Sequence, residues 1–256
     1  MGIKTIIFTL LLATAPAWSA DGEDQQFAPS DWDPALFEFL RAGPSLLPRD
    51  MEIRLPAPPA ATSAATATEI AILKLRKAYD RSPENMALIR SEGDPSKSVL
   101  DAFDAHGYLP DLAAVEGLEA FLTAATDEVR WFVVSEKWKY QRARPTQLDP
   151  GLEPVLAVPG HASYPSGHAT ESRALALVLA RLDPACAGAY LDLAEAIGDR
   201  REIAGLHFPS DSRAGEMLAD QVIRMVLDGP LSRELGEQSL KAVAWRAPEG
   251  ACPHGS

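Results

Sequence analysis

The strongest constraint on the fold is a long helical pattern between residues 111 and 140. Its apolar residues recur at steps of three and four positions, which places them on one face of an α-helix. They are Leu112, Val115, Leu118, Leu122, Val129, Phe132 and Val133. A helix with such a face must bury it against other elements, and the rest of the chain offers further helical patterns, no convincing alternating strand pattern and no internal repeat. We therefore predict an all-α fold, a compact single-domain bundle of several helices.

The other predicted helices flank this segment. Helical spacing begins at Thr66 and is interrupted at Pro83, and one or two shorter helices are expected over residues 84–106, with a break at residues 93–95. Residues 146–166 are rich in Pro and Gly and are predicted to form a loop. Helices are then expected over residues 167–182, 187–206 and 213–227, with a weaker one after Pro230.

The first 20 residues are predicted to be a signal peptide and not part of the fold. Lys4 supplies a short positive region, residues 6–12 are apolar, and residues 17–19 form a small-residue cleavage pattern. The alternative is an uncleaved membrane anchor. We expect an exported protein, periplasmic or secreted, with no stable membrane insertion. Residues 21–63, rich in Pro, Asp and Ala, are expected to be an irregular N-terminal arm on a helical domain of residues 64–256.

The chain is acidic, with a formal net charge of −12. This charge argues against nucleic acids and anionic membranes as partners, because both repel an acidic surface. A cluster of Lys and Arg in such a chain therefore requires a specific reason. The sequence leaves the oligomeric state open.

There are two cysteines, Cys186 and Cys252. In an oxidising compartment such a pair favours a disulfide that ties the C-terminal tail to the body, and the alternative is two free thiols. Spacing alone does not decide between them. The chain contains no HExxH or CxxC motif, so the sequence predicts no metal site.

Three short motifs carry residue types that suit phosphate chemistry. They supply Lys137 and Arg144 in KWKYQRARP, Ser166, Gly167 and His168 in YPSGH, and Arg201, His207 and Asp211 in RREIAGLHFPSD. Arginine and lysine match phosphate oxygens, and backbone amides at the start of a helix attract anions. One histidine can attack phosphorus while the other protonates the leaving oxygen, and a carboxylate can orient the attacking ring.

Each motif alone has a simpler interpretation. PSGH can be a turn followed by a helix N-cap. The basic run, which also contains Lys139 and Arg142, can be a solvated helix end that balances the helix dipole. His207 and Asp211 can form a surface pair, and His161 is interpreted as a loop residue.

Taken in order, the motifs K-x6-RP, PSGH and R-x5-H-x3-D resemble the signature of the type 2 phosphatidic acid phosphatase superfamily, which includes vanadium haloperoxidases. The exported chain of this length is most similar to class A bacterial non-specific acid phosphatases, from the LPAPPAATSAA arm to the last helices. The resemblance implies an all-helical fold and a phosphatase that needs no metal cofactor.

The resemblance also implies a role for each motif residue. His207 would be the nucleophile that forms a phosphohistidine, Asp211 would orient it, and His168 would be the general acid and then the general base. The phosphate-binding residues would be Lys137, Arg144, Ser166, Gly167 and Arg201. The third motif of the family usually begins Ser-Arg, whereas Arg200 precedes Arg201 here, which affects the expected substrate preference more than the reaction.

The leading hypothesis is an exported acid phosphatase that hydrolyses small phosphate monoesters through a phosphohistidine. The alternative is a haloperoxidase that holds vanadate in the same pocket; for the phosphatase, vanadate would be an inhibitor. A lipid phosphate phosphatase fits less well, because the mature chain has no expected membrane span. A phosphate-binding protein would need the cations but has no use for two histidines and an aspartate.

Overall fold

The computed structural model describes residues 26–109, 112, 117–229 and 252. Within these residues it contains helices and no strands, which confirms the all-α prediction. The described helices are α1 (Pro34–Ala42), α2 (Ala64–Tyr79), α3 (Pro83–Glu92), α4 (Val99–Ala105), α5 (Leu118–Tyr140), α6 (Pro145–Leu148), α7 (Gly167–Leu182), α8 (Ala187–Ile203) and α9 (Pro209–Asp228). Short 3-10 turns occur at Pro29–Asp31, Pro150–Leu152 and Pro184–Cys186. The predicted signal peptide and the weak helix after Pro230 lie outside the described residues.

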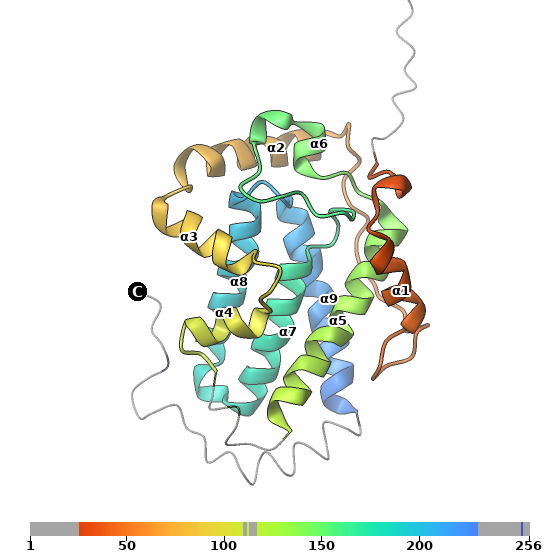
Figure 1. The fold of residues 1–256 in the computed structure, drawn as a ribbon, viewed down its shortest axis with the longest axis vertical. Helices are drawn as coiled ribbons and strands as arrows, with labels where there is room; N and C mark the ends of the chain where they lie inside the picture. Colours follow the sequence, from red (N-terminus) through yellow and green to blue (C-terminus); the bar gives the residue numbers. More distant parts are fainter. Residues whose placement is uncertain (1–25, 110–111, 113–116, 230–251, 253–256) are drawn as a thin grey trace, which may run out of the picture.

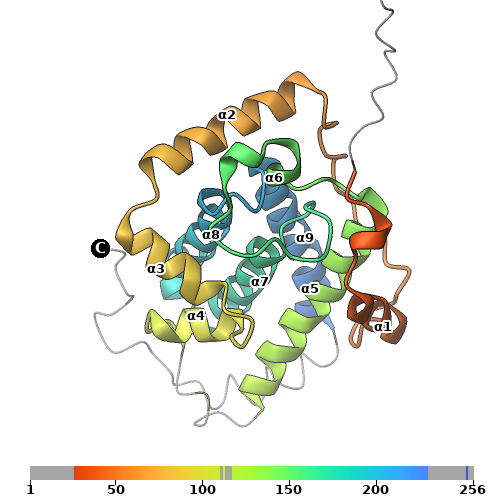
Figure 2. The ribbon, with the colours of Figure 1, turned by 45° about the horizontal axis from the view of Figure 1, so that its top comes forward.

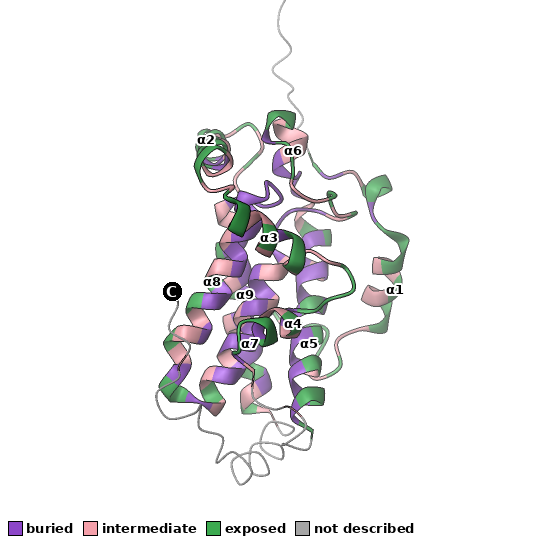
Figure 3. Ribbon diagram, turned by 60° about the vertical axis from the view of Figure 1, so that its left-hand side comes forward, coloured by how far each residue is buried: buried purple, intermediate pink, exposed green. Residues whose placement is uncertain are grey.

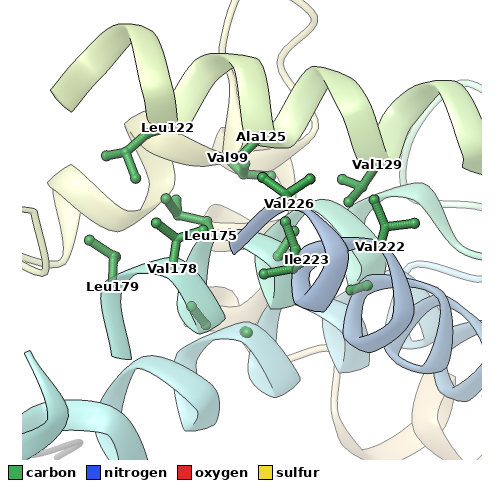
Figure 4. Close-up of a cluster of buried hydrophobic side chains, with 14 of the residues drawn as sticks. Val99, Leu122, Ala125, Val129, Leu175, Val178, Leu179, Val222, Ile223 and Val226 are labelled. Atoms are coloured by element: carbon green, nitrogen blue, oxygen red, sulfur yellow. The ribbon is translucent and has the colours of Figure 1, made fainter. Parts of the chain in front are cut away.

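Helices α5, α7, α8 and α9 run alongside one another, with α7 packed against the other three (Figure 1). Their apolar faces meet in one core, to which α4 adds Val99 (Figure 4). Buried residues follow the inward faces of these helices, whereas α1 and α2 on the outside are largely exposed (Figure 3). Burial of these aliphatic side chains is the main force that holds the bundle together.

Hydroxyl caps start several of the outer helices. The side chain of Ser63 accepts a hydrogen bond from the Thr66 amide at the start of α2, and Ser82 does the same for the Asn85 amide at the start of α3. Ser98 begins α4 with a reciprocal pair of hydrogen bonds to Asp101. These caps satisfy amides that a helix leaves unpaired, so α2, α3 and α4 begin where the sequence places a serine.

The first part of the segment over residues 26–63 lies along α5. Phe27 and Trp32 bury their rings in a small apolar cluster with Val134 of α5 and Ala162. The carboxylate of Glu128, itself 1 % exposed, accepts hydrogen bonds from the amides of residues 45, 46 and 47. The Glu128 carboxylate thus holds residues 45–47 against α5. The α-helix of this segment is α1.

α5 begins at Leu118 and not near residue 111, because Gly117 before it adopts the left-handed conformation, with a φ of 78°, which a continuing helix excludes. The predicted loop over residues 146–166 contains the short helix α6 at its start.

Two further helix ends also differ from the prediction. α9 begins at Pro209 and not at residue 213, because Pro209 occupies the first helical position and the Asp211 side chain caps the Phe208 amide at 3.0 Å. α8 ends at Ile203 and not at residue 206, because Gly205 adopts a φ of 77°, which glycine tolerates and a helix excludes. As a result Asp211 lies in the first turn of α9 and not in a loop.

α9 approaches the start of α7 at Gly215. A Cβ atom at this position would lie 2.7 Å from the Ser166 carbonyl oxygen and from the Thr170 hydroxyl. Because glycine has no Cβ, the first turns of α7 and α9 can lie this close, which brings the second and third motifs together.

Cys186 and Cys252 form a disulfide, which settles the alternative that the sequence left open. The bond ties residue 252 to the turn before α8. None of the described helices has the length and apolar composition needed to cross a bilayer.

Candidate active site

The three sequence motifs meet at one end of the four-helix core. The C-terminal ends of α5 and α8 and the first turns of α7 and α9 lie together there, below the loop that joins α6 to α7 (Figure 2). Lys137 belongs to the last turn of α5 and Arg201 to the last turn of α8. Ser166 and Gly167 open α7, and Arg144 precedes α6. Residues that lie up to 74 positions apart in the sequence therefore share one site.

A cavity of about 410 Å³ opens at this end of the bundle. Five of the eight predicted site residues line it: Lys137, Gly167, His168, Arg201 and His207. Arg144, Ser166 and Asp211 lie behind this lining and are fully buried. The structure thus brings all eight residues to one place, five on the cavity wall and three in direct support of it.

Hydrogen bonds determine the tautomer of His207. Its Nε2 lies 3.1 Å from a guanidinium nitrogen of Arg144, which can only donate, so Nε2 carries a lone pair. Its Nδ1 therefore carries the proton and donates it to the Asp211 carboxylate at 3.3 Å. Both side chains are buried, which excludes the surface pair considered above. Nε2 is thus the unprotonated ring nitrogen, the one that has a lone pair, and it lies next to an arginine.

Asp211 is saturated with donors. Besides His207, it accepts hydrogen bonds from Arg142 at 2.6 Å, from the Ser163 hydroxyl at 2.5 Å and from the Phe208 amide at 3.0 Å. Burial alone would raise the pKa of this carboxyl, but Arg142 and His207 outweigh it and hold the pKa below its usual range. Asp211 therefore stays ionised and keeps the ring of His207 in place.

Arg144 is the central cation of the site. It donates to the backbone carbonyls of His161 at 3.1 Å and Leu206 at 2.9 Å, and to His161 Nδ1 at 2.9 Å. Burial lowers its pKa to about 10, so the guanidinium remains charged at any physiological pH. The planar guanidinium group of Arg144 thus connects Leu206 and His207 to His161 in the loop before α7.

The other predicted phosphate-binding groups are deeply buried, and some of them lack partners. Lys137 donates to the carbonyls of Ala162 and Ser163, both at 2.9 Å, and burial followed by the charge of Arg144 lowers its pKa well below the usual value. The Ser166 hydroxyl and two nitrogens of Arg201, Nε and NH1, have no hydrogen-bond partner although they are buried. Buried donors without partners are rare and costly. Because Arg201 lines the cavity, its two unpartnered nitrogens can donate to a ligand that accepts hydrogen bonds.

Glu92, at the C-terminal end of α3, connects the second and third motifs. Its carboxylate accepts from Arg201 at 2.7 Å and from Arg200 at 2.8 and 3.0 Å, and its backbone carbonyl lies 3.1 Å from His168 Nε2. Arg200, the departure from the family pattern, therefore neither turns to solvent nor adds a free charge to the pocket. It shares the carboxylate that holds Arg201.

The surroundings of His168 favour its neutral form. Burial and then the charge of Arg201 lower its pKa to about 4. His207 is shifted in the same direction, first by burial and then by Arg144, with Asp211 opposing the shift. Both rings are therefore neutral at pH 7, and an anion placed between them would raise both pKa values.

Sequence reasoning missed three residues of the site. His161, interpreted as a loop residue, lines the cavity and accepts from Arg144. Arg142, grouped with a solvated helix end, is 7 % exposed and joins Asp211 to Glu69. Lys139 does fit that helix-end interpretation, because its side chain is half-exposed and pairs with Glu136. Glu92 lies 109 positions from Arg201, and no local pattern marks such a contact.

No family model matches this sequence. The fold is similar to that of a bacterial vanadium-dependent iodoperoxidase, with a TM-score of 0.62 and 18 % identity over 81 % of this chain. The match covers 61 % of the peroxidase, so the chain spans about three fifths of its length. A transmembrane PAP2-type phosphatidylglycerolphosphate phosphatase from Bacillus subtilis is also similar, with a TM-score of 0.50, 20 % identity, and coverage of 68 % of this chain and 88 % of the phosphatase.

At these identities the comparisons establish a shared fold. That fold is the one the sequence resemblance implied, since both similar structures come from the phosphatase and haloperoxidase groups named above. The closer likeness to class A acid phosphatases stays a prediction.

Proposed function

We propose that this chain is a phosphomonoesterase of the type 2 phosphatidic acid phosphatase superfamily, an acid phosphatase that cleaves small soluble esters through a phosphohistidine. The observation that carries the proposal is that His207, His168 and Arg201 line one cavity. Two buried nitrogens of Arg201 and the buried hydroxyl of Ser166 have no hydrogen-bond partner. A phosphoryl group supplies the acceptors that these donors lack. These donors would stabilise the transition state more than the bound ester, because negative charge spreads over the equatorial oxygens of phosphorus in the transition state.

In the first step His207 Nε2 attacks phosphorus and the bond from phosphorus to the ester oxygen breaks. His168 gives its proton to that oxygen, so the alcohol leaves neutral. Nε2 of His168 is engaged with the Glu92 carbonyl, which makes Nδ1 the nitrogen that serves the leaving oxygen. The charge that develops on the His207 ring is stabilised by Asp211 through the Nδ1 proton.

In the second step water attacks the phosphohistidine, and the nitrogen–phosphorus bond breaks. His168, neutral after the first step, takes a proton from this water and is ready for the next ester. Lys137, Arg144 and Arg201 hold the phosphoryl oxygens throughout, together with Ser166 and the Gly167 amide. Hydrolysis without a metal is part of this proposal, because these cations can supply the charge that a metal supplies elsewhere.

The pH dependence of kcat/KM should be bell-shaped and centred in the acid range. His168 must be protonated to donate, and with a pKa of about 4 roughly one free molecule in a thousand carries that proton at pH 7. On the acid side activity falls as His207 becomes protonated. Because a bound phosphate dianion stabilises the His168 imidazolium, the alkaline limb of kcat should lie at higher pH than that of kcat/KM. Profiles measured with an aryl phosphate check this, and activity that keeps rising above pH 8 would contradict it.

Location and partners belong to the same proposal. A signal peptide over residues 1–20, an arm over residues 21–63 and a domain over residues 64–256 suit an exported enzyme whose substrates are small phosphate esters. The residues that carry the export signal lie outside the described structure, so the proposal rests on their sequence alone.

The likeness to a vanadium-dependent iodoperoxidase favours a second candidate function. Vanadate has the charge and hydrogen-bonding capacity of phosphate, and the unpartnered donors of Arg201 and Ser166 fit it equally well. In this alternative Lys137, Arg144 and Arg201 would hold the oxyanion, with His207 Nε2 facing its metal. Bound vanadate would supply a Lewis-acidic centre for the oxidation of halides by peroxide.

One set of assays separates the two functions. The full chain should hydrolyse p-nitrophenyl phosphate in the presence of a chelator, and vanadate should inhibit this reaction. With vanadate, iodide or bromide, and hydrogen peroxide, it should show no halogenation above the buffer control. Halogenation that requires vanadate, without ester hydrolysis, would replace the phosphatase proposal with the peroxidase.

A further inference from the structure

The cavity extends along α5 away from the phosphate-binding end. Helix α5 presents Lys137, Val133 and Arg130 to it in succession. With a rise of 1.5 Å per residue, Arg130 lies about 10 Å along the helix axis from Lys137. Along α5 the cavity wall is therefore charged at Lys137 and apolar at Val133, and it has a second polar group at Arg130.

That second polar group is an ion pair between Arg130 and Glu171. The Nε and NH2 atoms of Arg130 each lie 3.1 Å from a different carboxylate oxygen of Glu171, a two-point contact. The side chain of Glu171 is 14 % exposed and that of Arg130 is 47 % exposed, so the carboxylate is the more deeply placed partner. Both residues line the cavity.

Glu171 lies close to the general acid. It follows His168 by three positions on α7, so the two side chains project from the same face of the helix. A Cβ atom on Gly167 would lie 3.9 Å from a Glu171 carboxylate oxygen, which also places that carboxylate near the proposed phosphate-binding amide. Because His168 is the proposed donor to the leaving oxygen, the alcohol part of the substrate would extend from His168 into the cavity that Glu171 and Arg130 also line.

Resting on the proposed function, we propose that the Arg130–Glu171 pair binds the alcohol part of the substrate and selects alcohols that carry hydroxyl groups over alcohols that carry a second phosphate. A hydroxyl can donate to the carboxylate of Glu171 and accept from the guanidinium of Arg130. A second phosphate would bring negative charge close to the carboxylate in a partly buried site, where repulsion is stronger than in water.

The other charged residues of the cavity wall do not offset this repulsion. Lys137, Arg201 and Glu92 belong to the phosphate-binding end, where the first phosphate would lie. Lys97 and Asp94, on the α3–α4 connection, carry opposite charges. Lys97 is exposed, so solvent screens its charge. Val99 and Val133 on the intervening wall offer no hydrogen bonds to a second anion. The buried carboxylate of Glu171 is therefore expected to decide which leaving groups are accepted.

Three matched esters test this inference: propyl phosphate, 3-hydroxypropyl phosphate and propane-1,3-diyl bisphosphate. They share one carbon skeleton and differ only at the far end. From initial rates, the wild-type chain should have its highest kcat/KM with the hydroxypropyl ester and its lowest with the bisphosphate. Glu171→Gln removes the negative charge and leaves Arg130 with only the more distant, exposed carboxylate of Asp127, at 3.8 Å. The preference for hydroxypropyl ester over bisphosphate should therefore fall by about tenfold.

Arg130→Gln leaves the Glu171 carboxylate unpaired, so the same preference should increase. A purely structural role for the pair would move both variants in the same direction. Asp220→Asn is the matched control. It breaks the ion pair between Asp220 of α9 and Arg173 of α7, and neither of these residues lines the cavity. Its preference should equal that of the wild type.

Each outcome has a separate meaning. Opposite shifts in the two variants support the inference. An unchanged preference, or shifts of the same sign, would overturn it and leave the proposed phosphatase intact. A wild-type chain that hydrolyses none of the three esters would overturn the proposed function, and this inference with it.

Discussion

Replacing His207 with alanine should reduce kcat for p-nitrophenyl phosphate by about 10⁴-fold or more. The variant lacks the nitrogen that forms the bond to phosphorus, and none of the neighbouring groups can replace it. Arg144 keeps its carbonyl partners at His161 and Leu206, so the cation cage should stay in place. Binding of inorganic phosphate should therefore persist, within about tenfold of the wild-type affinity.

Initial rates together with the inhibition constant of phosphate check this prediction, and circular dichroism and thermal unfolding confirm that the variant is folded. A folded His207→Ala protein that hydrolyses the ester at a rate close to that of the wild type would remove His207 from the mechanism. Loss of phosphate binding along with turnover would instead mean that the ring organises the cage.

Replacing Asp211 with asparagine should lower kcat by about 10³- to 10⁴-fold and destabilise the protein by about 3 kcal/mol. The amide cannot satisfy all four donors around the carboxylate, and its NH2 group must face one of them. His207 then loses the acceptor that keeps its proton on Nδ1, so Nε2 is no longer held as the nucleophile. Arg142 at the same time loses its buried counter-charge.

Glu69→Gln is the control that separates these two effects. Glu69 accepts from Arg142 and from the Ser210 amide but does not contact His207. This variant should lose stability while kcat changes by less than about tenfold. Urea unfolding and steady-state kinetics measure both quantities, and an equal loss of kcat in the two variants would show that Asp211 acts only through stability.

The sequence predicted the parts of the fold that depend on local patterns. The apolar spacing in α5 and α7 reflects a period of 3.6 residues that any long amphipathic helix must show. α7 has the predicted bounds and α5 the predicted end, whereas α5 begins seven residues later than predicted, after the left-handed Gly117. The ends were less predictable. The start of α9 depends on Pro209 and on the carboxylate of Asp211, and a motif read as a break was in fact the first turn of a helix.

The site residues within motifs were predictable, but those recruited from elsewhere were not. Nothing in KWKYQRARP tells which cations turn inward. That choice is made where α5 ends, at Gln141 in the left-handed conformation, after which Arg142 enters the interior and Lys139 stays near the surface. The sequence signal for Arg142 was its position two residues before Arg144, a motif residue that is also buried. Glu92 and Glu171 meet their arginines only in the folded chain, so only the structure could identify them.

The most direct test of the mechanism is to look for the phosphohistidine itself. The full chain would be mixed with excess ester at acid pH, quenched in base, in which phosphohistidine survives, digested, and mapped by mass spectrometry. The phosphoryl group should be found on the peptide that contains His207, should form within the first turnover, and should be absent from the His207→Ala variant. Sustained turnover with phosphate on His168, or with no phosphorylated residue at all, would contradict nucleophilic attack by His207.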